Sequence, residues 1–189
     1  MKKLLWLVLL ALAASCAYAD TLHLVSTPHG TVGPYNFTVN GTPDQLICFS
    51  AANSVHVGQT WTIHTYTIAD ITSNTHFPMT TKQANLLGYL ADELFADPGD
   101  WSLQNAIWYV LHTGGYKNAD YLSALAFINA HPEYSTTAIF YIPDNGWLQC
   151  GKGPQPFIGQ AKTPEPGSLA LLGSGLFGLA GLVRRRFSK

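Results

Sequence analysis

Thr60-Trp61-Thr62-Ile63-His64-Thr65-Tyr66-Thr67-Ile68 is the stretch of sequence that decides the fold. Apolar and aromatic side chains alternate along it with threonine and histidine, which is the period of a β-strand with one buried face. Earlier strand signals occupy residues 35–40 and 46–49, and turn-forming residues fill the segment 40–44. We therefore predict that residues 22–68 form strands.

The period of the apolar residues changes after residue 80 to that of amphipathic helices. Capping residues precede each apolar pattern, and proline or glycine follows it. We predict helices from Thr80 or Thr81 to the residue before Pro98, from Trp101 to His112, and from Asn118 to Pro132.

Strand signals return at residues 137–142, and more weakly at 147–150 and 157–158. Strands, then clustered helices, then strands again are typical of an α+β domain. For residues 20–160 we predict an antiparallel β-sandwich or barrel-like sheet. A cluster of about three helices is inserted between its early and late strands.

The N-terminus has the composition of a secretory signal peptide over residues 1–19. Lys2-Lys3 precedes an apolar stretch over residues 4–14, and Ala17-Tyr18-Ala19 supplies small residues at a cleavage site. We expect signal peptidase to cut after Ala19. An alternative is that Cys16 is the acceptor of a lipoprotein signal.

The C-terminal segment, residues 161–189, combines a linker with three ordered features. They are Pro164, Glu165 and Pro166, an apolar run over 169–183, and a basic end over 184–189 with Arg184, Arg185 and Arg186. The apolar run is short for a membrane helix, but a thin span anchored by the arginines is feasible. Positive charge at both ends of the chain places residues 20–160 outside the inner membrane.

This tail resembles the PEP-CTERM sorting signal of Gram-negative bacteria. The resemblance implies that an exosortase, a membrane protease of the transpeptidase type, recognises the tail and cuts near Pro164-Glu165-Pro166. It also implies that the protein is held briefly in the inner membrane and then passes to the cell surface or to an extracellular polysaccharide matrix.

Composition excludes several functional classes. Charged residues make up 11% of the chain and the net charge is -1, so no basic surface for nucleic acid is predicted. The sequence has no Cys-x-x-Cys and no pair of histidines at helical spacing, so we predict neither a metal site nor a cofactor. Cys48 and Cys150 remain after processing, and in an oxidising compartment a disulfide between them is one expectation.

A second resemblance involves Cys48. Three segments are similar to motifs of the thioester domains of bacterial surface proteins: Ile47-Cys48-Phe49, Gly58-Gln59-Thr60-Trp61, and Leu103-Gln104-Asn105-Ala106-Ile107-Trp108. The similarity covers about residues 32–160 and implies that Cys48 and Gln104 form an internal thioester, which an amine or hydroxyl of a surface protein or polysaccharide can attack. A thioester survives where water is excluded, which suits the neighbouring Phe49, Ile107 and Trp108.

Three states of Cys48 stay open at this stage: a thioester with Gln104, a disulfide with Cys150, and a free thiol. The first predicts a protein that attaches covalently, at most once per chain, and is no turnover enzyme. The second predicts a structural or glycan-binding matrix protein. A hydrolase is a third class, and it requires a histidine close to Cys48 in the fold.

Overall fold

The computed structural model describes residues 20–75, 77–144 and 154–161. Several predictions therefore lie outside the described residues. They are the signal peptide, Cys16, the strand at 147–150, Cys150, the Pro-Glu-Pro segment, the apolar run 169–183 and Arg184, Arg185 and Arg186.

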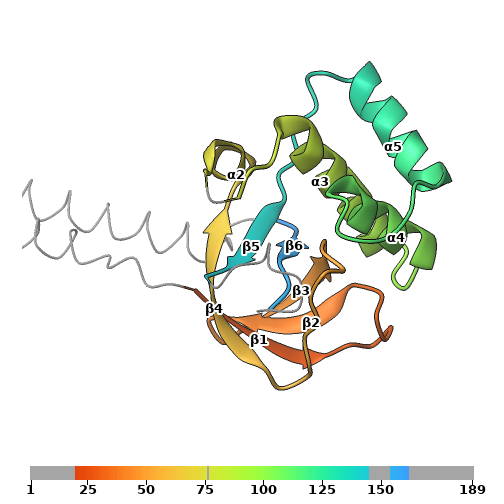
Figure 1. Ribbon diagram of the computed structural model, residues 1–189. Coiled ribbons are helices and arrows are strands. Elements are labelled where there is room, and N and C mark those ends of the chain that lie inside the picture. The colour runs from red at the N-terminus through yellow and green to blue at the C-terminus, as the bar shows by residue number, and fades with distance from the viewer. Residues whose placement is uncertain (1–19, 76, 145–153, 162–189) are drawn as a thin grey trace, which may run out of the picture.

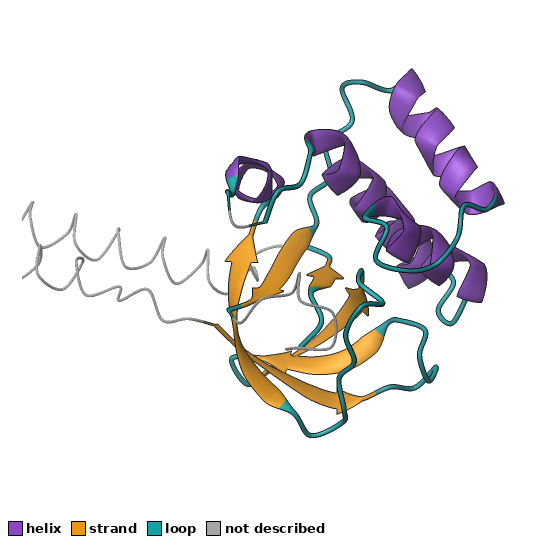
Figure 2. Ribbon diagram, viewed as in Figure 1, coloured by secondary structure: helices purple, strands orange, loops and turns teal. Residues whose placement is uncertain are grey.

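The sheet is a closed antiparallel barrel (Figures 1 and 2). Its strands follow the order β1-β2-β3-β6-β5-β4 around the barrel, so β6 closes it between β3 and β5. The strands are β1 Asp20–Ser26, β2 Tyr35–Val39, β3 Thr42–Cys48, β4 Thr60–Tyr66, β5 Ile139–Pro143 and β6 Phe157–Gly159. The prediction of an α+β fold with a barrel-like sheet is confirmed.

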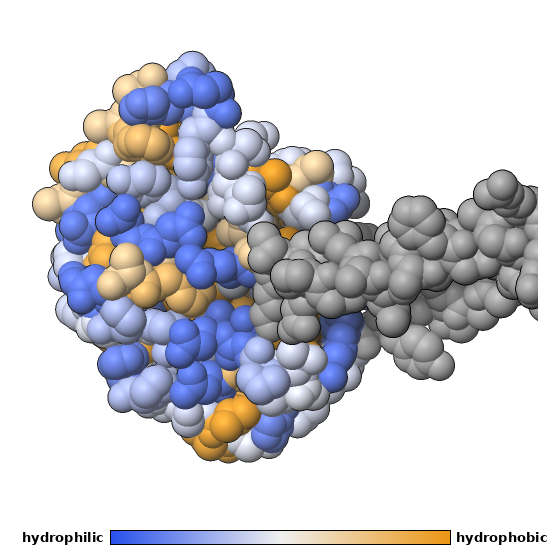
Figure 3. All heavy atoms as spheres, turned by 180° about the vertical axis from the view of Figure 1, so that it is seen from behind, coloured by the Kyte–Doolittle hydropathy of each residue, from blue (hydrophilic) through white to orange (hydrophobic). Residues whose placement is uncertain are grey.

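The described residues contain four helices, which lie in the chain between β4 and β5. They are α2 Ile68–Ser73, α3 Thr81–Ala96, α4 Trp101–Val110 and α5 Ala119–Ala130. Figure 2 shows α3, α4 and α5 gathered on one side of the barrel, with α2 beside the ends of β4 and β5. Seen from behind, the surface of the molecule carries hydrophilic residues intermixed with small hydrophobic groups (Figure 3).

Helix α2 corrects the prediction that the strand at residue 60 continues to Ile68. The strand ends at Tyr66, because Thr67 caps α2. The Thr67 side chain accepts from the Asp70 N–H, and the Asp70 carboxylate accepts in return from the Thr67 N–H. This capping box gives hydrogen-bond partners to two N–H groups at the start of the helix. That stabilisation outweighs the preference for a strand that the alternating residues up to Ile68 express.

Two other boundaries differ from the prediction. The turn between β2 and β3 consists of Asn40 and Gly41, both with positive φ, and β3 already begins at Thr42. Such a two-residue turn matches the twist of the flanking strands, so no longer turn is needed. Helix α4 ends at Val110, two residues early, because His112 adopts a positive φ of 54°.

Two hydrophobic cores result from the alternation along β3. Leu46 and Cys48 belong to the core inside the barrel, whereas Ile47 and Phe49 belong to the core between the barrel and the helices. Side chains on a strand point alternately to its two faces, so one short strand serves both cores. Cys48 is therefore a barrel residue next to the layer that packs against α4.

Candidate functional site

Cys48 lies at the last position of β3, is fully buried, and forms no disulfide with any residue that the structure describes. Opposite it on β6 lies Phe157, and its thiol donates a hydrogen bond to the carbonyl of Ser50 at 2.9 Å. Burial raises the pKa of the thiol from 9.0 to about 12, while the Ser50 backbone and the Trp108 side chain act in the opposite direction. As a thiol, Cys48 is therefore protonated at neutral pH.

Gln104 lies in the first turns of α4, whose start is fixed by Asp100. The Asp100 carboxylate accepts from the N–H groups of Ser102 and Leu103. The helix then directs Gln104 towards the sheet, where its side chain is completely buried. A buried amide needs partners for both its oxygen and its nitrogen.

Those partners join two distant segments of the chain. The Gln104 Nε2 donates to the Cys48 carbonyl at 2.8 Å, and its Oε1 accepts from the Gly33 N–H at 2.9 Å. The structure therefore brings Gln104 to Cys48, with a contact between the amide and the backbone of the cysteine. A donor on the amide oxygen also polarises the carbonyl, as in an oxyanion hole.

Trp108 is the predicted pocket residue that reaches the thiol. It is 9% exposed, and its indole N–H lowers the pKa of Cys48, so the two groups are close. The N–H does not meet the sulfur with hydrogen-bond geometry, and Nε1 has no hydrogen-bond partner among the described residues. An unpaired buried donor costs free energy, so it calls for an explanation.

Phe49 and Ile107 occupy the core on the helix side of the sheet and are fully buried. Phe49 packs edge-on against Phe77 and Phe140. Phe49 and Ile107 keep water from the layer between the barrel and the helices, where Gln104 lies. The Cys48 thiol is enclosed by the core inside the barrel.

Three residues near Cys48 were missed by the sequence analysis: Gly33, Tyr35 and Ser50. A Cβ on Gly33 would lie 3.1 Å from Ile47 Cγ1 and 3.3 Å from Gln104 Oε1, so a glycine permits this approach. Burial, and then the neighbouring Cys48, raise the pKa of Tyr35. The Gly33-Pro34-Tyr35 sequence signals a turn, but nothing local signals what approaches it.

Tyr35 and Trp108, which both interact with Cys48, line a small cavity of about 270 Å³. We call it the acceptor pocket. Its remaining lining residues are Thr27, Gly30, Thr31, Ala51, Asn53, Ser54, Val55 and Gln155.

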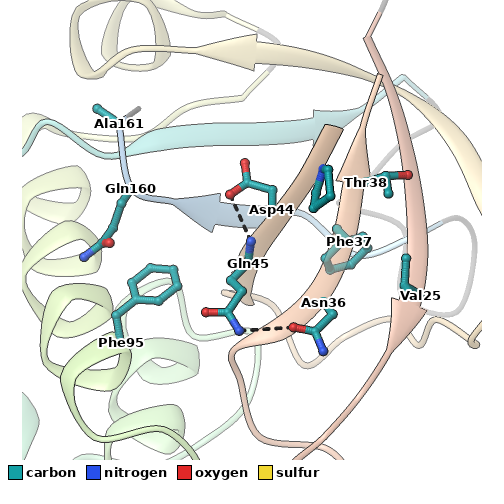
Figure 4. A pocket seen from close by; sticks show the side chains of 10 residues that line it. Val25, Asn36, Phe37, Thr38, Asp44, Gln45, Phe95, Gln160 and Ala161 are labelled. Atoms are coloured by element: carbon teal, nitrogen blue, oxygen red, sulfur yellow. Dashed lines mark hydrogen bonds between the residues drawn. The ribbon is translucent and has the colours of Figure 1, made fainter. Parts of the chain in front are cut away.

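A larger groove of about 610 Å³ lies elsewhere, between the β2–β3 hairpin, the end of α3 and the residues after β6 (Figure 4). Asp44, Gln45 and Asn36 form a hydrogen-bonded row along it, with Phe95 facing them. Neither Cys48 nor Gln104 lines this groove. We call it the outer groove.

The described ranges contain no group of three or more His, Cys, Asp or Glu residues able to hold a metal ion. Within those same ranges, no helix has the length and apolar composition of a membrane span.

Residues 162–186 match the family model of the PEP-CTERM protein-sorting motif. The match covers Pro164, Glu165, Pro166, Arg184, Arg185 and Arg186, the predicted sorting residues. The chain is accordingly an exported protein whose C-terminal motif directs membrane-anchored sorting by an exosortase. No curated protein and no solved structure matches the chain.

Proposed function

We propose that this exported, exosortase-sorted protein attaches covalently to partner molecules at the cell surface through a thioester between Cys48 and Gln104. The observation that carries the proposal is the 2.8 Å hydrogen bond from the Gln104 amide to the Cys48 carbonyl. The two residues are distant in sequence, and both side chains are fully buried. The motif likeness described above identifies the same pair.

Formation of the bond is an intramolecular acyl transfer. The Cys48 sulfur attacks the Gln104 Cδ, the C–N bond breaks, and the thiol proton leaves with the amide nitrogen as ammonia. The Gly33 N–H, 2.9 Å from the amide oxygen, stabilises the negative charge that the oxygen carries during attack. A pKa of about 12 leaves little thiolate, so the step depends on the fold holding the Cys48 sulfur close to the Gln104 Cδ.

Burial gives the thioester its lifetime. Hydrolysis requires water at the Gln104 Cδ, and both Cys48 and Gln104 are fully buried. Attack by a partner nucleophile then forms an amide or ester and returns Cys48 to the thiol. Each chain reacts once, so the protein is an attachment device and not a turnover enzyme.

Intact mass of the exported chain tests the proposal. We expect the mass to fall short of the sequence mass by one ammonia, and methylamine to add to that species. Gln104→Ala should abolish the loss, while Asn85→Ala, which removes another buried helix amide, should retain it. A full sequence mass, or a loss of two hydrogens from a Cys48–Cys150 disulfide, contradicts the thioester.

A second candidate is a non-covalent glycan-binding matrix protein, and the outer groove favours it. Planar amides, a carboxylate and an aromatic ring line it, which are the groups that bind sugar hydroxyls and pack on sugar rings (Figure 4). In affinity electrophoresis through dextran or alginate, Phe95→Ala should reduce retardation and Tyr116→Ala should not. Tyr116 is an exposed aromatic outside the groove. Equal migration with and without polysaccharide contradicts this candidate.

A further inference from the structure

The acceptor pocket and the Cys48 thiol share two walls. Tyr35 and Trp108 line the pocket, and both interact electrostatically with Cys48. Cys48 and Gln104 are fully buried and do not line the pocket, so a nucleophile in it has to pass Tyr35 or Trp108 to reach the pair.

The residues of the described chain that line the pocket are uncharged. Threonine, serine and tyrosine hydroxyls and the amides of Asn53 and Gln155 provide their polar groups, with no carboxylate or basic side chain among these described residues. A lysine ammonium that entered would lose water without gaining a counter-charge, which is unfavourable. Neutral hydroxyl groups would instead exchange hydrogen bonds with water for hydrogen bonds with the lining.

Two tryptophans add observations that point to a sugar. The Trp108 ring lines the pocket, while its buried indole N–H lies close to the Cys48 sulfur. Trp101 is 50% exposed and packs edge-on against Trp108, with ring centroids 5.7 Å apart. An exposed indole next to a polar pocket offers the C–H face of a sugar ring a flat apolar surface.

We propose that the acceptor pocket admits a neutral sugar hydroxyl as the group that captures the acyl chain of Gln104. This inference rests on the proposed thioester. The hydroxyl oxygen bonds to the Gln104 Cδ, the C–S bond breaks, and the hydroxyl proton ends on the Cys48 sulfur. The Trp108 N–H lies close to that sulfur, where it stabilises the negative charge of the leaving group.

A competition experiment on the exported chain tests the acceptor. Methyl α-glucoside and methylamine are mixed with the protein at pH 7, and the two adducts are counted by intact mass. Ser54→Asp adds a carboxylate at an exposed position of the lining. We expect the glucoside adduct in the wild type, and a shift of about fivefold towards methylamine in this variant, as expected for one opposite charge a few ångströms away.

Two controls separate charge at the pocket from other effects. Ser54→Asn keeps the size without the charge, and Ser123→Asp places the same charge on an exposed position of α5 outside the pocket. Neither should change the adduct ratio. A chain that loses ammonia but captures only methylamine, or whose ratio is the same in Ser54→Asp, overturns the acceptor assignment alone. A chain that keeps its ammonia overturns the thioester and the acceptor together.

Discussion

Two buried amides, Asn85 on α3 and Gln104 on α4, each tie a helix to two backbone groups elsewhere in the chain. In both side chains the amide nitrogen donates a hydrogen bond of 2.8 Å to a backbone carbonyl, and the amide oxygen accepts one of 2.9 Å from a backbone N–H. Either amide is fully explained as a structural bridge, because a buried amide has to satisfy both of its ends.

The surroundings of the two bridges differ. Asn85 joins α3 to Tyr134 and Thr136, neither of which carries a thiol. Gln104 joins α4 to Gly33 and Cys48. The comparison teaches that the hydrogen bonds supply rigidity in both places, and that chemistry requires the added nucleophile. Asn85 is therefore the matched control for every experiment on Gln104.

Removal of either amide side chain should cause the largest loss of stability. Gln104→Ala leaves the Gly33 N–H and the Cys48 carbonyl buried without a partner and opens a cavity, which we expect to lower the free energy of unfolding by about 4 kcal/mol. Asn85→Ala should cost about 3 kcal/mol, since its shorter side chain leaves a smaller cavity. Urea unfolding measures both, and a cost below about 1 kcal/mol for Gln104→Ala would contradict the bridge.

Gly88→Ala should have the next largest effect, at the Asn85 bridge. A Cβ there would lie 2.0 Å from Thr136 Oγ1 and 2.4 Å from its Cβ, and Thr136 is buried. Alanine favours a helix by about 1 kcal/mol over glycine, but overpacking against a β-branched side chain costs more. We expect a net loss of about 2 kcal/mol in urea unfolding, and a gain in stability would contradict the packing.

Alkaline pH distinguishes a thiol from a thioester at the Gln104 bridge. Folding raises the pKa of the Cys48 thiol from 9.0 to about 12, so its contribution to stability is fully present below pH 9 and declines as pH rises towards 12. A free thiol should therefore make the wild type lose up to about 1.4 kcal/mol per pH unit more than Cys48→Ala.

A thioester has no proton to lose, so it predicts parallel stability curves for the wild type and Cys48→Ala in the same range. Urea unfolding between pH 8 and pH 10 separates the two cases. The pKa of Tyr141 is also raised by burial, and its titration occurs in both proteins and cancels in the difference. Burial, and then Cys48, raise the pKa of Tyr35, and the part due to Cys48 adds to the difference only when Cys48 is a free thiol.

Gly33→Ala should have the smallest effect. The added Cβ would lie 3.1 Å from Ile47 Cγ1 and 3.3 Å from Gln104 Oε1, close contacts that shifts of a few tenths of an ångström relieve. The lower entropy of the unfolded chain offsets part of the strain, so we expect a change below about 1 kcal/mol. A cost as large as that of Gly88→Ala would show that the Gln104 bridge tolerates no movement.

Local patterns predicted much of the fold. Helix starts were predicted at Thr80 or Thr81, at Trp101 and at Asn118. In the structure Thr80, Asp100 and Asn118 are the caps, and their side chains accept from N–H groups two or three residues ahead. Helix α2 was missed although Thr67 and Asp70 have the spacing of a capping box. The alternation of residues 60–68 favoured a strand, and only the observed cap ends it.

The burial of Gln104 had no comparable local signal. Its contact with Cys48 was expected from a resemblance between motifs, and its bond to Gly33 was not expected at all. The amphipathic pattern of α4 indicates which of its residues face inwards. It does not indicate which backbone N–H and carbonyl groups lie within hydrogen-bond distance of them. The same limit applies to the acceptor pocket, whose lining comes from segments around residues 27–35, 51–55, 108 and 155.

The sequence by itself determined the export and sorting of this protein and the kinds of element that it forms, because composition, capping and period act over short stretches of chain. Only the tertiary structure decided that β6 closes the barrel between β3 and β5 and that the Gln104 amide meets the Cys48 backbone 56 residues away. The physical reason is that a buried polar group accepts whichever partner packing brings to it, and packing depends on the whole chain at once.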